Sequence, residues 1–391
     1  MEFDKLVDLR GSNTKLSRLQ ENLLQKLSEI DFNLDGLTKT DLKTLKKQII
    51  QALPRLRSLY QENKTKCERS PGIVNLSYAN KVPEKVMVVS LLRRGDGHAE
   101  RLQRICEKGG WQYQWCAPEK FTGFDGKRSK SKSIALVDLD HEYFSNINFI
   151  SYLEKLKLNF DFVVGFAFDG WSYNSNVHDE LVRNCLDLVW CPNKYFELYS
   201  NNLPVNKVTP FPIPPGISSY DHCTILSNVA EQSNIKFSGN IERQSFPRLL
   251  WFIEKSKKIG VEFDLSNYKA RSTYHEYDSY ISYLGRLRQC KAVINFSTRN
   301  DMSRGYTGRS AETIAMRQPL LQEYCPAFNI LYKPGEHFLQ FSNIKDFDNI
   351  YAQVMSSEFV SREIAESAYS FFQERYSDRR LLEHLTAALD V

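Results

Sequence analysis

Short runs of apolar residues recur along the chain, and polar stretches with helical spacing separate them. Such runs are typical of strands buried on both faces of a parallel sheet, with the intervening helices covering the sheet. The first five runs lie at residues 86–92, 134–138, 160–165, 186–191 and 207–211. This alternation predicts a doubly wound, Rossmann-like α/β domain over residues 85–225.

The alternation restarts at Ile235, after a stretch over residues 217–233 that we interpret as polar and irregular. Further strands are predicted at residues 235–239, 261–264, 292–296 and 319–322. Helices are predicted at residues 247–259, 308–317, 345–356 and 361–388. We therefore expect a second Rossmann-like domain over residues 230–391, facing the first across a cleft, because ligands bind where parallel strands end.

The N-terminal part has a different texture. Leucines at helical spacing over residues 14–30 and 38–53 flank Asp35-Gly36, which predicts a helical hairpin within residues 1–62. Polar residues 63–84 follow, and we interpret them as a linker. The hairpin is interpreted as an appendage packed on the main domains. A dimerisation element or a peripheral contact with a membrane is the alternative.

Composition excludes several classes of protein. Hydrophobic residues make up 42% of the 391, which excludes global disorder. Lys and Arg number 52 against 47 Asp and Glu, too small an excess for an extended nucleic-acid surface. No apolar run is long enough for a membrane-spanning helix, and we find no signal peptide. The eight cysteines form no CxxC pair, so we expect reduced thiols and a cytoplasmic location.

The second predicted domain carries a family pattern. Its segments are residues 237–243, 283–296, 309–321, 333–336 and 376–380. In the third of these, R-x-x-E-x-x-A is followed at fixed spacing by Pro319 and Leu321. The region resembles the C-terminal domain of GT-B glycosyltransferases, within them the CgeB-like, family-1-type group. Residues 187–193 and 214–216 extend the resemblance loosely into the first domain, and the hairpin lies outside it.

The resemblance implies that a sugar is transferred from a nucleotide-sugar donor to a glycan or lipid-linked acceptor, as in polysaccharide biosynthesis. It implies a metal-independent reaction without a cofactor, since the nucleotide-sugar is itself a substrate. Two alternatives stay open: an inactive GT-B scaffold, or a sugar-nucleotide epimerase of the same fold.

The predicted donor site lies at the start of one helix. The residues that open this helix are Thr307, Gly308, Arg309 and Ser310. Their N–H groups suit an anion, and Arg309 can pair with a diphosphate as a fork. The resemblance implies that Glu312 accepts hydrogen bonds from the ribose hydroxyls of the donor. Gly239 allows the backbone of the first loop to approach the phosphates, and Arg243 adds positive charge there. Alternatively, Arg309 and Glu312 form an exposed pair within the helix.

The sequence departs from the family at two points. Arg317-Gln318 occupies the place of the usual Gly before the proline, and Arg304 stands eight residues before Glu312, where many retaining members have a second Glu. The stereochemical outcome therefore stays open.

An inverting reaction needs a base on the acceptor side. His98 and Asp169 each follow a predicted strand of the first domain, and His178 is a weaker candidate. Asp138 and Asp140 resemble a metal-binding DxD, but they lie in the first domain, so we interpret them as a solvated turn and expect no metal site.

Overall fold

The structure is a computed structural model of the chain. It describes residues 73–92, 97–121, 131–139, 149–167, 185–191, 208–228, 235–238, 261–264, 277–297, 306–342, 344–356 and 358–391. The predicted hairpin, the predicted helix at residues 247–259 and the DxD residue Asp140 lie outside these ranges.

The first sheet has six parallel strands in the order β2-β1-β3-β4-β5-β6. The strands are β1 (Val86–Leu91), β2 (Gln112–Trp115), β3 (Lys132–Asp138), β4 (Phe162–Phe166), β5 (Leu188–Trp190) and β6 (Val208–Thr209). The helices that accompany them are α4 (His98–Lys108), the short η3 (Pro118–Lys120) and α5 (Phe149–Asn159). All five predicted strands are present, and Gly109-Gly110 ends α4 as expected.

The second sheet has five parallel strands in the order β11-β10-β9-β7-β8. They are β7 (Lys236–Ser238), β8 (Glu262–Asp264), β9 (Val293–Asn295), β10 (Leu320–Glu323) and β11 (Leu339–Phe341). The helices are α8 (Ser219–Ser227), α10 (Tyr277–Arg288), α11 (Gly308–Ala315), α12 (Pro326–Asn329), α13 (Ile344–Ser356), α14 (Glu358–Arg375) and α15 (Asp378–Leu389). Two separate parallel sheets confirm the predicted fold class, while the domain boundaries stay a prediction.

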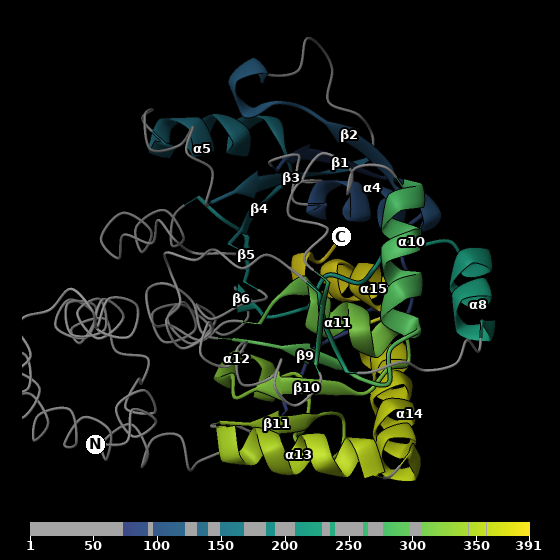
Figure 1. Ribbon diagram of the computed structural model, residues 1–391. Helices are drawn as coiled ribbons and strands as arrows, with labels where there is room; N and C mark the ends of the chain where they lie inside the picture. The colour runs from purple at the N-terminus through teal and green to yellow at the C-terminus, as the bar shows by residue number, and fades with distance from the viewer. Residues whose placement is uncertain are drawn as a thin grey trace, which may run out of the picture.

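The two sheets are joined by a shared core. Side chains of β1 alternate between faces: Val86 and Val88 point into the shared core, whereas Val89 and Leu91 join a cluster with α5 on the outer face. The shared core also includes residues from the second sheet and from α10, α11 and α15. Figure 1 shows the first sheet above the second, with α4, α11 and α15 between them and α13 below (Figure 1). The domains are therefore packed against each other along this side.

Each sheet has a topological switch point, where the chain leaves one side of a strand and continues on the other. In the first sheet it lies between β1 and β3, and in the second between β7 and β9. Ligands of open α/β sheets bind at the carboxyl ends of the strands beside such points. Among the described elements, α4 follows β1 along the chain and α11 follows β9.

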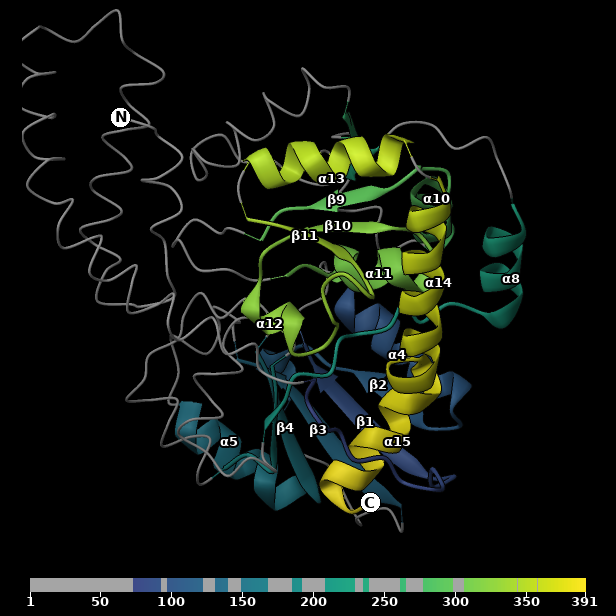
Figure 2. The ribbon, with the colours of Figure 1, turned by 90° about the horizontal axis from the view of Figure 1, so that it is seen from below.

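The last helix of the chain packs on the first domain. His384 of α15 contacts Thr209 at the end of β6, and its ring stacks on Phe211 with centroids 5.3 Å apart. Figure 2 shows α15 beside the first sheet, continuing from α14, which packs on α11 and α13 of the second domain (Figure 2). The single helix predicted over residues 361–388 is wrong in one respect: it breaks at Tyr376, and Ser377 starts a new helix.

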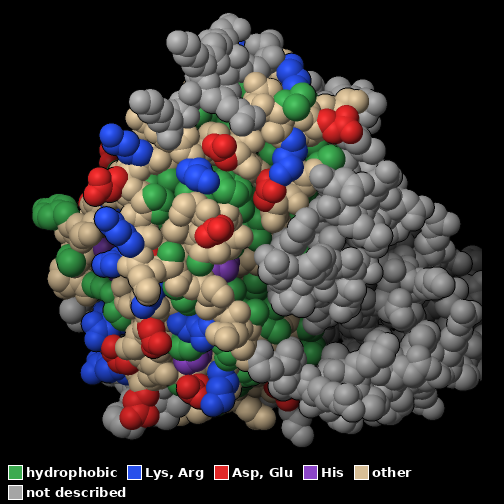
Figure 3. Space-filling view, turned by 180° about the vertical axis from the view of Figure 1, so that it is seen from behind, with side chains coloured by type: hydrophobic (Ala, Val, Ile, Leu, Met, Phe, Trp, Pro, Cys, Tyr) green, Lys and Arg blue, Asp and Glu red, His purple; other side chains and the backbone are tan. Residues whose placement is uncertain are grey.

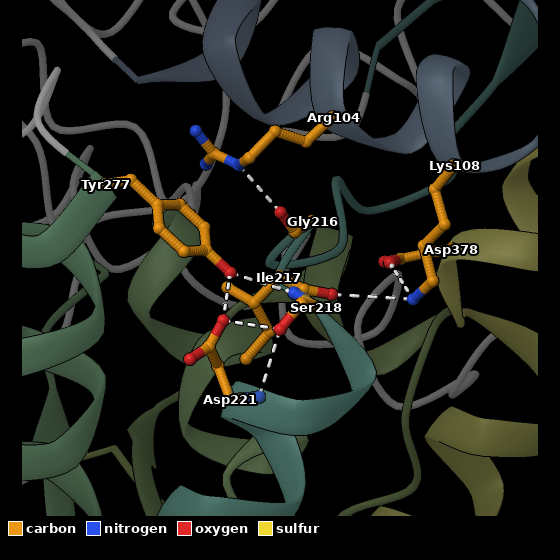
Figure 4. A network of polar contacts seen from close by, with 8 residues as sticks. All are labelled: Arg104, Lys108, Gly216, Ile217, Ser218, Asp221, Tyr277 and Asp378. Carbon is orange, nitrogen blue, oxygen red and sulfur yellow. Dashed lines mark hydrogen bonds and ion pairs between the residues drawn. The ribbon is translucent and has the colours of Figure 1, made fainter.

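The segment that connects the two sheets is held by side chains of α4 at Gly216 and Ile217, just before α8. Arg104 Nε donates to the carbonyl oxygen of Gly216 at 2.7 Å, and Lys108 Nζ lies 3.4 Å from the carbonyl oxygen of Ile217 (Figure 4). Ser218 caps α8 by accepting from the backbone N–H of Asp221 at 3.0 Å. The expectation of an irregular segment over residues 217–233 is therefore wrong for α8, because the Ser218 cap starts a helix there.

Residues 73–79 lie along the C-terminal helices. The N–H of Val74 donates to Ile330 and that of Ala79 to Glu383, and Leu76 is buried. The hydroxyl of Tyr78 donates to the carbonyl oxygen of Arg375 at 2.8 Å. This part of the predicted linker is thus an ordered strap against the second domain.

Arg317, which departs from the family pattern, also has an unusual backbone conformation. Arg317 has φ = 56°, in the left-handed region that the family's usual Gly adopts without steric strain. Its Nε lies 2.5 Å from Glu366 Oε1, and its guanidinium lies over the Tyr369 ring. The chain keeps the turn and places a side chain on α14.

The surface and the cysteines of the described residues give little further indication of function. On the face shown in Figure 3, acidic and basic side chains are interspersed (Figure 3). The seven cysteines of the described ranges are free thiols. Among the described residues, no helix has both the length and the apolar character needed to cross a membrane.

Candidate functional site

A buried polar cluster lies where β9 and β10 end, beneath the start of α11. Asn295, the last residue of β9, pairs in register with Gln322 of β10, and its Nδ2 lies 2.9 Å from Gln322 Oε1. Ser310 Oγ donates to the same Gln322 oxygen at 2.7 Å. Asn295 Oδ1 accepts from Thr307 Oγ1 and from Arg309 Nη1, both at 3.0 Å. These bonds fix the first turn of α11 on the ends of the two strands.

Arg309 crosses the switch point of the second sheet. While Nη1 bonds Asn295 at the end of β9, the guanidinium carbon lies 5.1 Å from the centre of the Phe237 ring in β7. Gly239 is the next residue in the sequence after β7, which ends at Ser238. The cation therefore sits between the strands at which the fold binds its ligands, although Gly239 and Arg243 lie outside the described residues.

Glu312 is buried one turn into α11, with 3% of its surface exposed. Its Oε1 accepts from the hydroxyl of Tyr280 at 3.0 Å, and its Oε2 from that of Tyr283 at 3.0 Å. Arg101 Nη2, from α4 of the first domain, lies 2.6 Å from Oε1. The alternative of an exposed pair with Arg309 is wrong, because Glu312 turns to the domain interface and Arg309 to Asn295.

Arg101 is held on three sides. Besides Glu312, its guanidinium lies over the Tyr280 ring at 5.1 Å and against the backbone of Gly308. A Cβ added at Gly308 would lie 3.4 Å from both terminal nitrogens, so Gly308 leaves the space that the cation occupies. Burial raises the pKa of the Tyr280 hydroxyl well above its usual range, so this group stays a donor to the carboxylate.

His98 opens α4, one turn before Arg101. It is buried, and its ring lies 5.9 Å from that of Phe166, the last residue of β4. His98 thus lies at the carboxyl ends of the first sheet, on the helix whose Arg101 pairs with Glu312. Its role as a base stays a prediction, and Asp169 and His178 lie outside the described residues.

Polar strand ends were not among the predicted site residues. Asn295, Gln322 and Glu323 are all buried at the ends of β9 and β10. The N–H of Ser297 donates to Glu323 Oε2 at 2.8 Å, and Gln322 Nε2 donates to Ser297 Oγ at 2.5 Å. Their signal in the sequence is a polar residue closing each apolar run. Among the described residues, no cluster of His, Cys, Asp or Glu has the composition of a metal site.

Comparisons with known proteins give one family match in the second domain and structural neighbours that extend over both domains. Residues 239–387 match the family model described as Glycosyl transferase-like. The structure of HepE from Anabaena with UDP and glucose is similar, at 9% identity and TM-score 0.49, covering 79% of this chain and 100% of that one. A glycosyltransferase from Rickettsia africae gives 10% identity, TM-score 0.48, and coverages of 80% and 98%. A search of curated proteins gives no match.

The family match confirms the resemblance inferred from residues 309–321 at the level of a glycosyltransferase. The finer CgeB-like assignment stays a prediction. The match begins at Gly239 and takes in α11, so the buried cluster under that helix belongs to the matched region.

Proposed function

We propose that this chain, whose residues 239–387 form a glycosyl transferase-like domain, moves a sugar from a nucleotide-sugar donor to a glycan or lipid-linked acceptor. The observation that carries the proposal is the position of Arg309 across the switch point of the second sheet, between Phe237 and Asn295. A cation at this point is placed to neutralise a diphosphate at the start of α11.

The donor lies against the second domain in this proposal. Arg309 binds the diphosphate, and the residues that follow β7 in the sequence, Gly239 and Arg243 among them, approach the same phosphates. Glu312 accepts from the ribose. Its three described donors use three of the roughly four acceptor positions of a carboxylate, so one ribose hydroxyl is accommodated rather than a vicinal pair.

The acceptor lies against the first domain, at the ends of β1 and β4. Here His98, or Asp169, which follows β4 in the sequence, takes the proton of the acceptor hydroxyl if the reaction inverts. Charge that develops on the leaving diphosphate is stabilised by Arg309 and by the N–H groups of α11, so no metal ion is needed. The acceptor in this proposal is a glycan or a lipid-linked molecule.

The hairpin predicted within residues 1–62 is the proposed element of membrane contact or pairing. Sedimentation of the chain with and without these residues, alone and with anionic vesicles, tests this role. An unchanged sedimentation profile in both conditions contradicts it.

Turnover of a nucleotide-sugar panel, followed by mass spectrometry, tests the proposed function. Each donor is incubated with and without a glycan fraction and a lipid-linked glycan fraction. Nucleotide release that depends on an acceptor supports transfer. Interconversion of donors without an acceptor identifies an epimerase. Neither activity, with no nucleotide bound in a calorimeter, identifies an inactive scaffold.

A variant pair sharpens this test. Arg309→Ala removes the cation at the switch point and is expected to weaken nucleoside diphosphate binding by about 1.5–3 kcal/mol, the range for hydrogen bonds to a charged group. Arg317→Ala is the matched control, because it removes an arginine just beyond the C-terminal end of α11 that pairs with Glu366. Equal binding by the two variants contradicts the donor-site assignment.

A further inference from the structure

The carboxylate at the centre of the donor site is held by a residue of the other domain. Arg101 Nη2 lies 2.6 Å from Glu312 Oε1, and the two side chains are 8% and 4% exposed. A buried ion pair at this distance fixes the direction of both partners, because neither has water with which to exchange its bond. We propose that Arg101 is a positioning residue, which aims the Glu312 carboxylate at the donor ribose.

The proposal rests on the proposed function, and it adds that the donor site is complete only across the domain interface. Tyr280 and Tyr283 of the second domain each donate to one oxygen of Glu312. These two hydroxyls leave the carboxylate free to tilt about the line between them. Arg101 supplies the third contact, which sets that tilt and so the direction of the acceptor position left on Oε2.

The cation is itself fixed by its surroundings. It lies over the Tyr280 ring at 5.1 Å and against Gly308, where a Cβ would meet its two terminal nitrogens at 3.4 Å. Tyr280 therefore contacts both partners: the Arg101 guanidinium lies over its ring, and its hydroxyl donates to the Glu312 carboxylate. Lysine, a point charge without a planar fork, cannot reproduce this arrangement.

The helix that bears Arg101 is anchored to the connection between the domains. Gly216 has φ = 61°, and a Cβ there would lie 2.7 Å from the carbonyl oxygen of Arg101. One turn further along α4, Arg104 donates to Gly216 and lies over the Tyr277 ring at 5.1 Å (Figure 4). Its guanidinium also lies over the Tyr280 ring, at 5.7 Å, farther out than that of Arg101. Arg104 thus shares the helix, the charge and the interdomain setting of Arg101, but no described hydrogen bond or ion pair joins its side chain to Glu312.

Calorimetric titration with matched nucleotides tests the inference. UDP, GDP and ADP are titrated first, and the tightest binder is then compared with its 2′-deoxy and 3′-deoxy forms. The wild type is expected to bind the ribose form roughly 10- to 150-fold more tightly than one deoxy form, the factor for one hydrogen bond to a charged group. In Arg101→Gln this ratio falls to near one, and in Arg101→Lys it falls at least threefold.

The ratio separates positioning from a structural role. Arg104→Gln weakens the domain interface and is expected to keep the wild-type ratio, even where its overall affinity falls. If Arg101→Gln does not fold, as judged by circular dichroism, Arg101→Lys carries the test. A wild-type ratio in the folded Arg101 variants overturns the inference, and so does a fall of equal size in Arg104→Gln.

The failure of this inference is distinguishable from the failure of the proposed function. A wild type that binds a diphosphate without distinguishing ribose from deoxyribose overturns the roles of Arg101 and Glu312 toward the ribose, and it leaves nucleotide binding at Arg309 and the proposed sugar transfer standing. A wild type that binds none of the three diphosphates removes the donor proposal, and the inference falls with it.

Discussion

Thr209 Oγ1 lies 2.6 Å from Nε2 of His384, which joins the last strand of the first sheet to the last helix of the chain. Nδ1 of the same ring lies 2.8 Å from the carbonyl oxygen of Ser77. A carbonyl only accepts, so Nδ1 carries the proton, and Nε2 accepts from the threonine hydroxyl. One neutral imidazole therefore connects the strap, the first sheet and α15.

Stability is expected to fall below about neutral pH because of this ring. Burial lowers the pKa of His384 from its ordinary 6.5, more than the bond to Ser77 raises it, and burial also lowers the pKa of His337. As the pH falls through 6.5, His384 and His337 take up protons in the unfolded chain before they do so in the folded chain. The free energy of unfolding is therefore highest above pH 6.5 and decreases below it. Urea unfolding at a series of pH values measures this.

His384→Gln provides the control, since an amide does not titrate in this range. The variant is expected to be less stable than the wild type at pH 8, yet to lose less stability on acidification. The slope that remains belongs in part to His337. An unchanged dependence on pH would show that the imidazole does not stay neutral in the folded chain.

Glu312→Gln is expected to destabilise the chain as well as weaken nucleotide binding. The substitution leaves the guanidinium of Arg101 buried without its counter-charge, which costs about 3–5 kcal/mol for such pairs. Adding Arg101→Met removes the stranded charge, so the double variant is expected to lose less than the sum of the single losses. Urea unfolding of the wild type, the two single variants and the double variant measures these losses. Losses that simply add in the double variant would contradict the expected coupling between Arg101 and Glu312.

Arg317→Gly is expected to be about 1 kcal/mol more stable than Arg317→Ala. Both lose the half-exposed pair with Glu366, which contributes little, but only glycine relieves the left-handed backbone at φ = 56°. Thermal unfolding of the two variants compares them directly. An alanine variant as stable as the glycine variant would mean that this turn is not strained.

His98→Asn and Asp169→Asn are expected to separate the two candidate bases. In an inverting enzyme, loss of the base lowers kcat by about 10²–10⁴, while nucleotide binding in the second domain persists. Single-turnover assays with the best donor and acceptor measure the first quantity, and calorimetry the second. Near-normal kcat in both variants removes both candidates.

Strands buried on both faces were predictable because an apolar run has few other folded states available to it. Residues 86–92 and 134–138 correspond to β1 and β3. The strands β2 and β11 were missed. In β2 the sequence QYQW alternates and lies at the sheet edge, half covered, so no apolar run forms. Strand order was not predictable, since it depends on contacts between distant segments.

The candidate site was predictable only where one segment carries it. The residues from Thr307 to Glu312 open a helix after a buried strand, and the local pattern shows this. Arg101 gives a weaker signal: it is a charged residue between Ala99 and Leu102 on the buried side of α4. Its partner lies more than 200 residues away, and no local pattern reports such a pairing.

The packing of α15 on the first domain has a consequence for synthesis on the ribosome. Phe211 contacts His384 and Tyr376, which are made roughly 170 residues later. At typical elongation rates this is a delay of about 10–35 s. During that interval the apolar side of the first sheet has no α15 to cover it, and a nascent chain in this state is a natural client for a chaperone. Chains truncated before Asp378 should therefore aggregate even though their first sheet is complete.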